Sequence, residues 1–206
     1  MVVTSVVPFD KKRKKIYIDG EYAFLLYYMD MKECGVHEGE ELSDSQYRKI
    51  IEEILPKRAK LRAMNLLKSK DYTRKQLGDK LAEGLYPAEI IEEALDYVQS
   101  YKYIDDERYA RDYITYHMAS RSRKRITQDL MGKGVSKDVF EPVLNELYAE
   151  EPGDPEYDQV LQLLRKKKYD PENCDYKEKQ KIMAFLLRKG FDMSTVRRAM
   201  NCDFDD

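Results

Sequence analysis

The sequence has no tryptophan, only two histidines and only three cysteines, which leaves few residues for a metal site. Cys34, Cys174 and Cys202 lie far apart, and none of them forms a CxxC pair. Together with His37 and His117 they cannot provide the ligand spacing of a zinc site. The scarcity therefore excludes a zinc module and indicates reduced thiols in a reducing compartment.

Long apolar runs are also missing. No segment approaches about 18 uncharged apolar residues, the length that a transmembrane helix requires. Met1–Thr4 lacks the basic residues that precede the apolar stretch of a signal peptide. We therefore expect a soluble, cytoplasmic protein with no membrane segment.

Recognised catalytic patterns are absent as well, since the sequence contains no P-loop and no GxSxG motif. His117 follows Tyr113 by four residues on a predicted helix, which favours a packed histidine over a general base. Asp105 and Asp106 are adjacent at a helix start, so their side chains diverge and capping explains them better than acid–base catalysis. We predict that the protein is not an enzyme and needs no cofactor.

Charged residues make up 37% of the 206 residues, and hydrophobic residues make up 42%. The charged share is well above the usual quarter, so the core must be thin relative to the surface. Small helical units stacked along a line have this property. Seventeen tyrosines against six phenylalanines fit the same arrangement, because tyrosine can bury its ring while its hydroxyl stays in water.

The formal net charge of −2 conceals a strong segregation of charge. Residues 57–83 contain nine basic and three acidic residues, whereas residues 141–158 contain seven acidic residues and no basic one. Alternating regions of positive and negative charge suit a partner whose own charges alternate along its length, such as a protein–nucleic acid filament. Each patch on its own is equally compatible with a solvated helix surface of mixed charge.

The first 42 residues read as a small antiparallel sheet. Val2–Phe9 and Lys15–Met29 are rich in Val, Ile, Tyr and Phe. The segment Ile16–Phe24 predicts a hairpin with a type I′ turn at Asp19-Gly20, and Lys11–Lys15 predicts a basic loop between strands.

From about residue 58 onward one helical pattern occurs three times. In each copy a polar, basic start leads into an amphipathic helix whose apolar residues lie four apart on one buried face. These pairs are Leu77/Leu81, Ile126/Leu130 and Ile182/Leu186. Another helix precedes each pair and a shorter one follows it, which gives three helices per copy.

A glycine ends the middle helix of each copy, where a left-handed residue is needed to leave the helix. These residues are Gly84, Gly134 and Gly190. The next apolar positions follow each glycine by six and by ten residues: Ile90 and Ala94, Phe140 and Leu144, Val196 and Met200. The first copy is one residue shorter between its last leucine, Leu81, and its glycine.

Helix starts can be placed by their capping chemistry. The predicted features are capping boxes at Ser43/Gln46 and Thr73/Gln76, Pro87 in a first turn, Ser136 and Ser194 as N-caps, and Asp154-Pro155 as a cap with a proline at the first helical position. The Ser43 cap opens a helix that runs through Leu55.

We therefore expect a mainly α fold with three tandem three-helix repeats in a curved, elongated row, preceded by the small antiparallel sheet. The expected domains are a β-rich segment at 1–42, a connecting helix with the first repeat at 43–104, the second repeat at 105–149 and the third at 154–206. An acidic link at 150–153 separates the last two repeats.

The segment Tyr101–Ile114 contains an Asp N-cap at Asp105, an acidic first turn, and a helix with Arg108 and Arg111 exposed. Its Ile-Asp-Asp sequence followed by an aromatic-Ala pair resembles the central signature of the RecX family. Three further segments resemble that family in order: Ala63–Leu77, Ser120–Lys124 and Ile126–Gly134. The resemblance covers residues 58–200. The third repeat departs from the pattern, because Glu178 and Gln180 interrupt the basic residues at the start of its middle helix and residues 170–173 lengthen the connection before that helix.

The resemblance implies a regulator that binds in the groove of the RecA–DNA filament and modulates, mostly inhibits, ATP hydrolysis and strand exchange in DNA repair, homologous recombination and the SOS response. Partners would be the RecA filament and, more weakly, single- or double-stranded DNA; the protein would be a monomer. The expected contacts are basic side chains at repeated positions, which suit carboxylates and phosphates. They are Arg74, Lys75, Arg108, Arg111, Arg121, Arg123, Lys124 and Arg125.

Two alternatives stay open at this stage. The same basic side chains could solubilise the surface or pair within a helix. A stand-alone nucleic-acid-binding module would also begin its helical triplets with basic residues. Against that module, the pI is about 5.9, and the acidic stretch from Glu141 would repel a long duplex.

Overall fold

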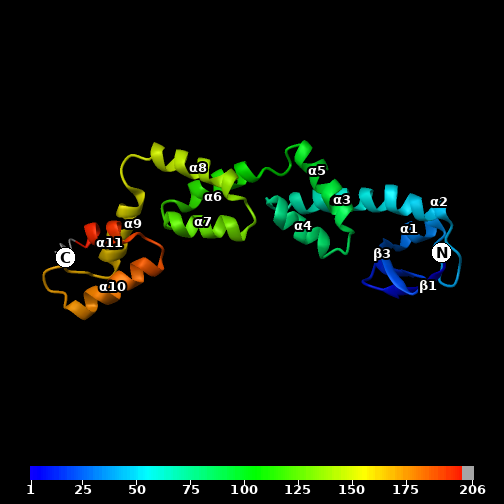
Figure 1. The fold of residues 1–206 in the computed structure, drawn as a ribbon, viewed down its shortest axis with the longest axis horizontal. Helices are drawn as coiled ribbons and strands as arrows, with labels where there is room; N and C mark the ends of the chain where they lie inside the picture. Colours follow the sequence, from blue (N-terminus) through cyan, green and yellow to red (C-terminus); the bar gives the residue numbers. More distant parts are fainter. Residues whose placement is uncertain (201–206) are drawn as a thin grey trace. The chain divides into compact units, whose positions relative to one another are not determined.

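The computed structural model describes residues 1–200 and contains two compact units, one ending at Asp105 and the other beginning at Asp106 (Figure 1). Cys202 and residues 201–206 of the predicted third domain lie outside the described residues. The fold is mainly helical, with a three-stranded antiparallel sheet at its start, as the sequence predicts.

The N-terminal sheet has strand order β1–β2–β3, with β1 at Val3–Pro8, β2 at Arg13–Ile18 and β3 at Glu21–Tyr27. Asp19 and Gly20 join β2 to β3 with φ angles of 50° and 91°. Positive φ at both central residues defines a type I′ turn, so the predicted hairpin is confirmed.

The predicted basic loop at Lys11–Lys15 is too long. The Oδ1 atom of Asp10 accepts hydrogen bonds from the amides of Lys12 and Arg13, both at 2.8 Å. This side-chain turn closes the loop early, because an aspartate can satisfy backbone amides two and three residues ahead. Strand β2 therefore already begins at Arg13.

The predicted strand through Met29 is also too long, because helix α1 (Tyr28–Cys34) follows β3 directly. This helix of seven residues begins with Tyr and Met, residues included in the predicted strand, so it was not predicted. Gly35 ends the helix in a left-handed conformation, with φ at 63°.

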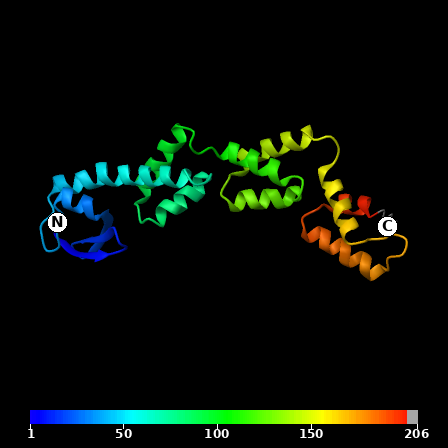
Figure 2. The same cartoon turned by 180° about the vertical axis from the view of Figure 1, so that it is seen from behind.

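Residues 44–67 form one continuous rod (Figures 1 and 2), made of α2 (Asp44–Lys49), η1 (Ile50–Ile54) and α3 (Leu55–Leu67). The predicted capping box is present, since Ser43 Oγ accepts the Gln46 amide at 3.3 Å and Gln46 Oε1 accepts the Ser43 amide at 2.9 Å. The connecting helix therefore runs without a break into the first helix of the first repeat.

A π-helical turn sits inside this rod. The Leu55 amide donates to the Ile50 carbonyl five residues back, and the next residue, Pro56, has no amide to donate. The wider turn places Ile50, Ile54 and Leu55 on the buried side of the rod.

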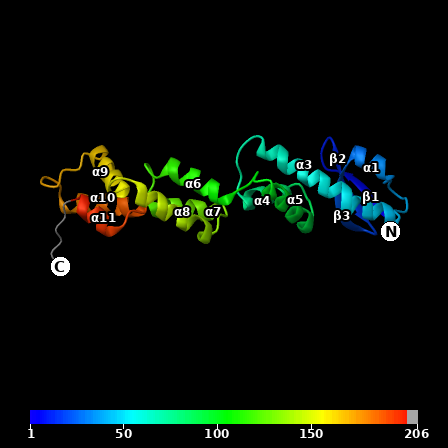
Figure 3. The ribbon, with the colours of Figure 1, turned by 90° about the horizontal axis from the view of Figure 1, so that it is seen from above.

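The first repeat consists of α3, α4 (Arg74–Ala82) and α5 (Ala88–Ser100). One hydrophobic core extends from the sheet residues Ile16 and Phe24 through α3 to Leu77 and Leu81 on α4. Figure 3 shows the long rod passing from the side of the sheet to α4 and α5. The predicted capping box of Thr73 with Gln76 is confirmed.

The predicted role of Gly84 is wrong. Leu85, not Gly84, takes the left-handed conformation at the end of α4, with φ at 60°. Leu85 follows Leu81 by four residues, which is the spacing of Gly134 after Leu130 and of Gly190 after Leu186. The left-handed position of the first copy is therefore occupied by leucine. The copy is still one residue shorter, but the missing residue lies after that position, since Ile90 follows Leu85 by five residues and the other copies have six.

The second repeat consists of α6 (Asp106–His117), α7 (Arg123–Gly132) and α8 (Lys137–Glu150). Its separate core packs Ile126 and Leu130 of α7 against α6 and α8. Gly134 has a φ of 84°, as its predicted place after the helix requires.

The third repeat consists of α9 (Pro155–Lys166), α10 (Tyr176–Arg188) and α11 (Met193–Ala199), and it has a core of its own. Gly190 has a φ of 95°, as predicted. The α9 start is also confirmed, because Asp154 accepts the Tyr157 amide at 3.1 Å.

Three helix starts differ in detail from the prediction. Pro87 occupies the N-cap position of α5 rather than the first turn. Asp192, rather than Ser194, is the N-cap of α11, and α10 begins earlier than its basic start implies, because the Asp175 side chain accepts the Glu178 amide at 2.7 Å. Ser136 is the N-cap of α8, as predicted. The domain limits 1–42, 43–104, 105–149 and 154–206 remain a proposal.

Candidate partner-binding surface

In the first repeat, Arg74 is held between two helices rather than extended into solvent. Its guanidinium contacts Gln99 Oε1 at 2.5 Å, Glu92 Oε2 at 2.6 Å and Asp96 Oδ1 at 2.7 Å, all on α5. The next residue, Lys75, is exposed and pairs with Asp79 of its own helix at 2.7 Å. Both basic residues predicted here therefore already have acidic partners.

The two arginines predicted to be exposed on α6 differ. Arg108 is exposed, as predicted. Arg111 is half-buried, and its guanidinium donates to both carboxylate oxygens of Glu146 on α8, at 3.1 and 2.9 Å. This pair lowers the pKa of Glu146, chiefly through the hydrogen bond from Arg111. The prediction that Arg111 is exposed is wrong, because the second repeat uses it to join α6 to α8.

Arg121 and Arg125 share one carboxylate in the second repeat. Arg121 Nη1 lies 2.5 Å from Asp129 Oδ2, and Arg125 Nε lies 3.1 Å from Asp129 Oδ1. The Asp129 side chain is only 13% exposed, whereas that of Arg125 is 58% exposed. One carboxylate cannot neutralise two guanidiniums, so the cluster keeps a net positive charge and spare N–H donors held in fixed directions.

Arg123 lies at the start of α7 and contacts the last helix of its repeat. Its guanidinium donates to Asn145 Oδ1 and lies 5.2 Å from the centre of the Tyr148 ring. Arg74 occupies the equivalent first position of α4 and likewise contacts α5. The repeated arginine therefore has a packing role, whereas the neighbouring Lys124 is exposed and forms no ion pair within residues 1–200.

The second and third repeats meet through specific polar contacts. Ser122 Oγ donates to the Lys189 carbonyl at 2.7 Å, and Gln159 Nε2 donates to the Met118 carbonyl at 2.5 Å. Glu156 accepts the Arg123 amide at 3.0 Å, and burial raises the pKa of the Glu156 carboxyl. These contacts link α7 and the segment before it to α9 and to the end of α10.

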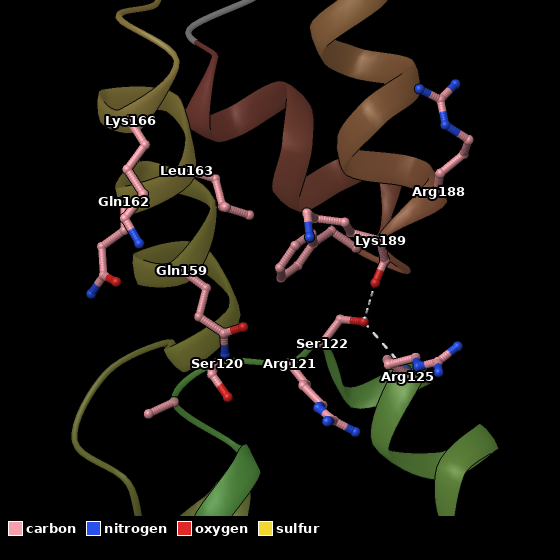
Figure 4. Close-up of a pocket in the computed structure, with 12 residues that line it drawn as sticks. Ser120, Arg121, Ser122, Arg125, Gln159, Gln162, Leu163, Lys166, Arg188 and Lys189 are labelled. Carbon is pink, nitrogen blue, oxygen red and sulfur yellow. Dashed lines mark hydrogen bonds between the residues drawn. The ribbon is translucent and has the colours of Figure 1, made fainter. Parts of the chain in front are cut away.

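A cavity of about 520 Å³ lies at this junction (Figure 4). Of the eight predicted residues, only Arg121 and Arg125 line it. Its other cationic lining residues, all from the third repeat, are Lys166, Arg188 and Lys189. Sequence reasoning missed these three, although runs of basic residues at the ends of two helices were a signal that could have pointed to them.

His117 is a packed histidine, as predicted. Its ring centre lies 4.3 Å from that of Tyr113 and 4.8 Å from that of Tyr116. Burial lowers the pKa of His117, and the charge of Arg121 lowers it further.

Within residues 1–200, no three His, Cys, Asp or Glu side chains are grouped so that they could hold a metal ion. In the same part of the chain, no helix has both the length and the apolar character needed to cross a membrane.

Three domains of one known protein family match this chain in consecutive segments. The first three-helix domain of RecX matches residues 59–97, the second matches residues 105–144, and the third matches residues 154–200. These segments correspond to α3–α5, α6–α8 and α9–α11.

Several relatives named "Regulatory protein RecX" are similar over nearly the whole chain. The one from Caldanaerobacter subterraneus subsp. tengcongensis is 34% identical over 98% of this chain and 99% of its own length. The one from Clostridium perfringens strain 13 is 29% identical over 93% of this chain and 92% of its own length.

Solved structures share the fold. A crystal structure of regulatory protein RecX covers 98% of this chain and 99% of its own, with a TM-score of 0.64 and 24% identity. A crystal structure of RecX from Lactobacillus salivarius covers 72% of this chain and 96% of its own, with a TM-score of 0.62 and 24% identity. With three family domains in order and a relative at 34% identity along its length, the chain belongs to the RecX family.

Proposed function

We propose that this protein is a non-catalytic regulator of the RecA recombinase. It binds the RecA–ssDNA filament in its groove, lowers ATP hydrolysis and strand exchange, and thereby restrains recombination and the SOS response. The observation that carries the proposal is the presence of three RecX three-helix domains, in order, in a chain whose relatives are named regulatory proteins. It acts in the cytoplasm as a monomer and needs no cofactor.

The proposed contacts are the eight basic residues of the repeats. Four of them are exposed and would meet a partner first: Lys75, Arg108, Lys124 and Arg125. The other four are only partly exposed and take part by exchanging an internal carboxylate or amide for one on the filament. They are Arg74, Arg111, Arg121 and Arg123.

DNA-dependent ATP hydrolysis by the cognate RecA tests this function. We expect sub-stoichiometric amounts of the protein to lower the steady-state rate, because one molecule in a filament groove affects several subunits. An unchanged rate at every ratio, with the protein folded by circular dichroism, would overturn the proposal.

The contact residues are tested with the double variant Lys124→Glu/Arg125→Glu. It reverses two neighbouring charges on α7, and we expect at least tenfold more protein to be needed for half inhibition. The matched control is Lys177→Glu/Lys181→Glu on α10, which reverses two exposed charges that do not line the cavity. An equal loss in both variants would show that overall charge, rather than this surface, determines inhibition.

The cationic cavity favours a second candidate function, direct binding of nucleic acid without the recombinase. Omitting RecA separates the two functions, because a stand-alone nucleic-acid-binding protein retains its full affinity and its salt dependence in that assay.

A further inference from the structure

The first unit carries a hollow of about 390 Å³ that is lined by the sheet and by α3. Four of its six lining residues are cations, and they come from the β1–β2 turn, from β2 and from α3. Segments far apart in the sequence therefore contribute to one positively charged surface. The lining residues are Asp10, Lys11, Lys12, Arg13, Tyr27 and Arg62.

The one carboxylate in this lining is already engaged. Asp10 Oδ1 accepts the amides of Lys12 and Arg13, and Asp10 Oδ2 lies 2.7 Å from Arg13 Nη2. The other three cations, Lys11, Lys12 and Arg62, are exposed and form no ion pair within residues 1–200. With four cations and one carboxylate, the hollow keeps an excess of three positive charges, which favours an anionic partner.

The aromatic rings beside the hollow hold cations in place. The Arg13 guanidinium lies 5.0 Å from the centre of the Phe9 ring and 6.0 Å from that of Tyr27. Lys15 also lies over Phe9, at 5.4 Å, and Arg58 lies over Tyr27, at 4.7 Å. Surfaces that bind single-stranded nucleic acid usually offer aromatic faces on which bases stack. Cations already occupy these two rings, so the surface suits carboxylates better than bases.

An exposed apolar pair adjoins the hollow. The Tyr28 amide donates to the Lys12 carbonyl at 3.0 Å, so α1 begins directly beside the β1–β2 turn. Tyr28 and Met29, the first two residues of α1, are 60% and 67% exposed. Tyrosine and methionine are enriched where one protein binds another. Cations beside an apolar pair complement an acidic polypeptide that also carries an apolar side chain.

We propose that the β1–β2 turn, the start of α1 and Arg62 form a docking surface for an acidic segment of another protein. Carboxylates of that segment bind Lys11, Lys12 and Arg62 through charge-assisted hydrogen bonds. An apolar side chain beside those carboxylates packs on Tyr28 and Met29. The inference does not depend on the proposed contact with the RecA filament, because none of these residues is among the eight basic residues assigned to that contact.

The charge contact is tested with a fluorescently labelled peptide of alternating Asp and Glu residues with one central Phe. Its binding to the full chain is measured by anisotropy, with no recombinase present. In Lys12→Glu/Arg62→Glu we expect affinity to fall about tenfold and the dependence on salt to weaken. The matched control is Lys177→Glu/Lys181→Glu, with the same charge change on exposed residues of α10 outside the hollow; it should bind nearly as tightly as the parent protein.

The apolar contact is tested with a second peptide in which Ser replaces Phe. This change should weaken binding to the parent protein about fivefold, because the apolar contact is lost. It should have no effect on binding to Tyr28→Ser/Met29→Ser, which lacks the other half of that contact. An equal loss in both proteins would overturn the assignment of the apolar side chain to Tyr28 and Met29.

Two further measurements locate and identify the occupant. The peptide should shift the amide NMR signals of residues 10–13 and 28–29, and shifts confined to the second unit would overturn the site. A single-stranded thymidine dodecamer should displace the peptide only at concentrations at least about tenfold higher than the unlabelled peptide needs. Equal displacement by the oligonucleotide would overturn the assignment to a protein partner. Equal loss of affinity in the control variant, or no binding at low salt, would overturn the docking surface.

Discussion

The two units of the molecule join their parts by different means. In the first, one hydrophobic core runs from Ile16 and Phe24 of the sheet to Leu81 of the first repeat. In the second, each repeat has a separate core, and polar contacts such as that from Ser122 to Lys189 link the two. Apolar burial is large and non-directional, whereas a few hydrogen bonds add little net stability but fix geometry. We infer that the first unit unfolds as one block, whereas the second can open repeat by repeat.

Removing the same core leucine from each unit tests this comparison with the largest expected effect. Leu81 and Leu130 are equivalent and fully buried, so Leu81→Ala and Leu130→Ala should each reduce the free energy of unfolding by about 3 kcal/mol. Native-state hydrogen exchange should show Leu81→Ala weakening protection from the sheet through α5. Leu130→Ala should weaken α6–α8 and leave α9–α11 largely protected. Equal weakening of the third repeat by Leu130→Ala would contradict the comparison.

The left-handed turns allow a second comparison, with a smaller effect. At Gly190, φ is +95° and an added Cβ would lie 2.5 Å from Ser122 Oγ, the atom that bonds the Lys189 carbonyl. Gly190→Ala should therefore cost about 2 kcal/mol in unfolding free energy and loosen the junction of the second and third repeats. Leu85→Gly should change it by less than about 1 kcal/mol, because relief of backbone strain offsets the lost apolar burial. Thermal and urea unfolding measure the change in unfolding free energy for both variants. A Gly190→Ala variant as stable as the parent protein would contradict the predicted clash at the junction.

The smallest expected effect concerns pH. Burial raises the pKa of Glu156 in the folded protein, so the folded state binds this proton more tightly than the unfolded chain does. The stabilising contribution of the protonated form is present at low pH and is lost as pH rises through the raised pKa. Glu156→Gln keeps an acceptor for the Arg123 amide, so it should flatten the decline in stability with rising pH over that interval. Unfolding measured from pH 4 to 8 checks this, and an identical pH profile in the variant would refute the role of Glu156.

Much of the fold follows from local sequence patterns. Apolar residues four positions apart predicted the buried faces of α4, α7 and α10. Ser43, Thr73 and Asp154 marked helix starts, because capping uses side chains only three residues away. Helix α1 escaped prediction because seven residues with strand-compatible composition carry no clear period. Leu85 escaped it because a left-handed leucine contradicts the local preference for glycine at such a position.

The candidate site was less predictable than the fold. A count of basic residues cannot distinguish Arg111, which joins α6 to α8 through Glu146, from Arg125, which remains largely exposed. Arg125 pairs with Asp129 of its own helix, whereas the partner of Arg111 lies 35 residues away, at a sequence distance set by the packing of the repeat. Gln159 gave no signal at all, because its hydrogen bond to the Met118 carbonyl joins residues 41 positions apart along the chain.

The sequence by itself determined the helical repeats, their caps and the N-terminal hairpin, because these depend on side chains within a few residues of each other. It also carried the ordered motifs by which the chain belongs to its family. Only the tertiary structure decided which arginines are occupied by internal carboxylates and which line the cavity between the second and third repeats. Those outcomes depend on contacts between helices that lie far apart along the chain, and on the exclusion of water between them.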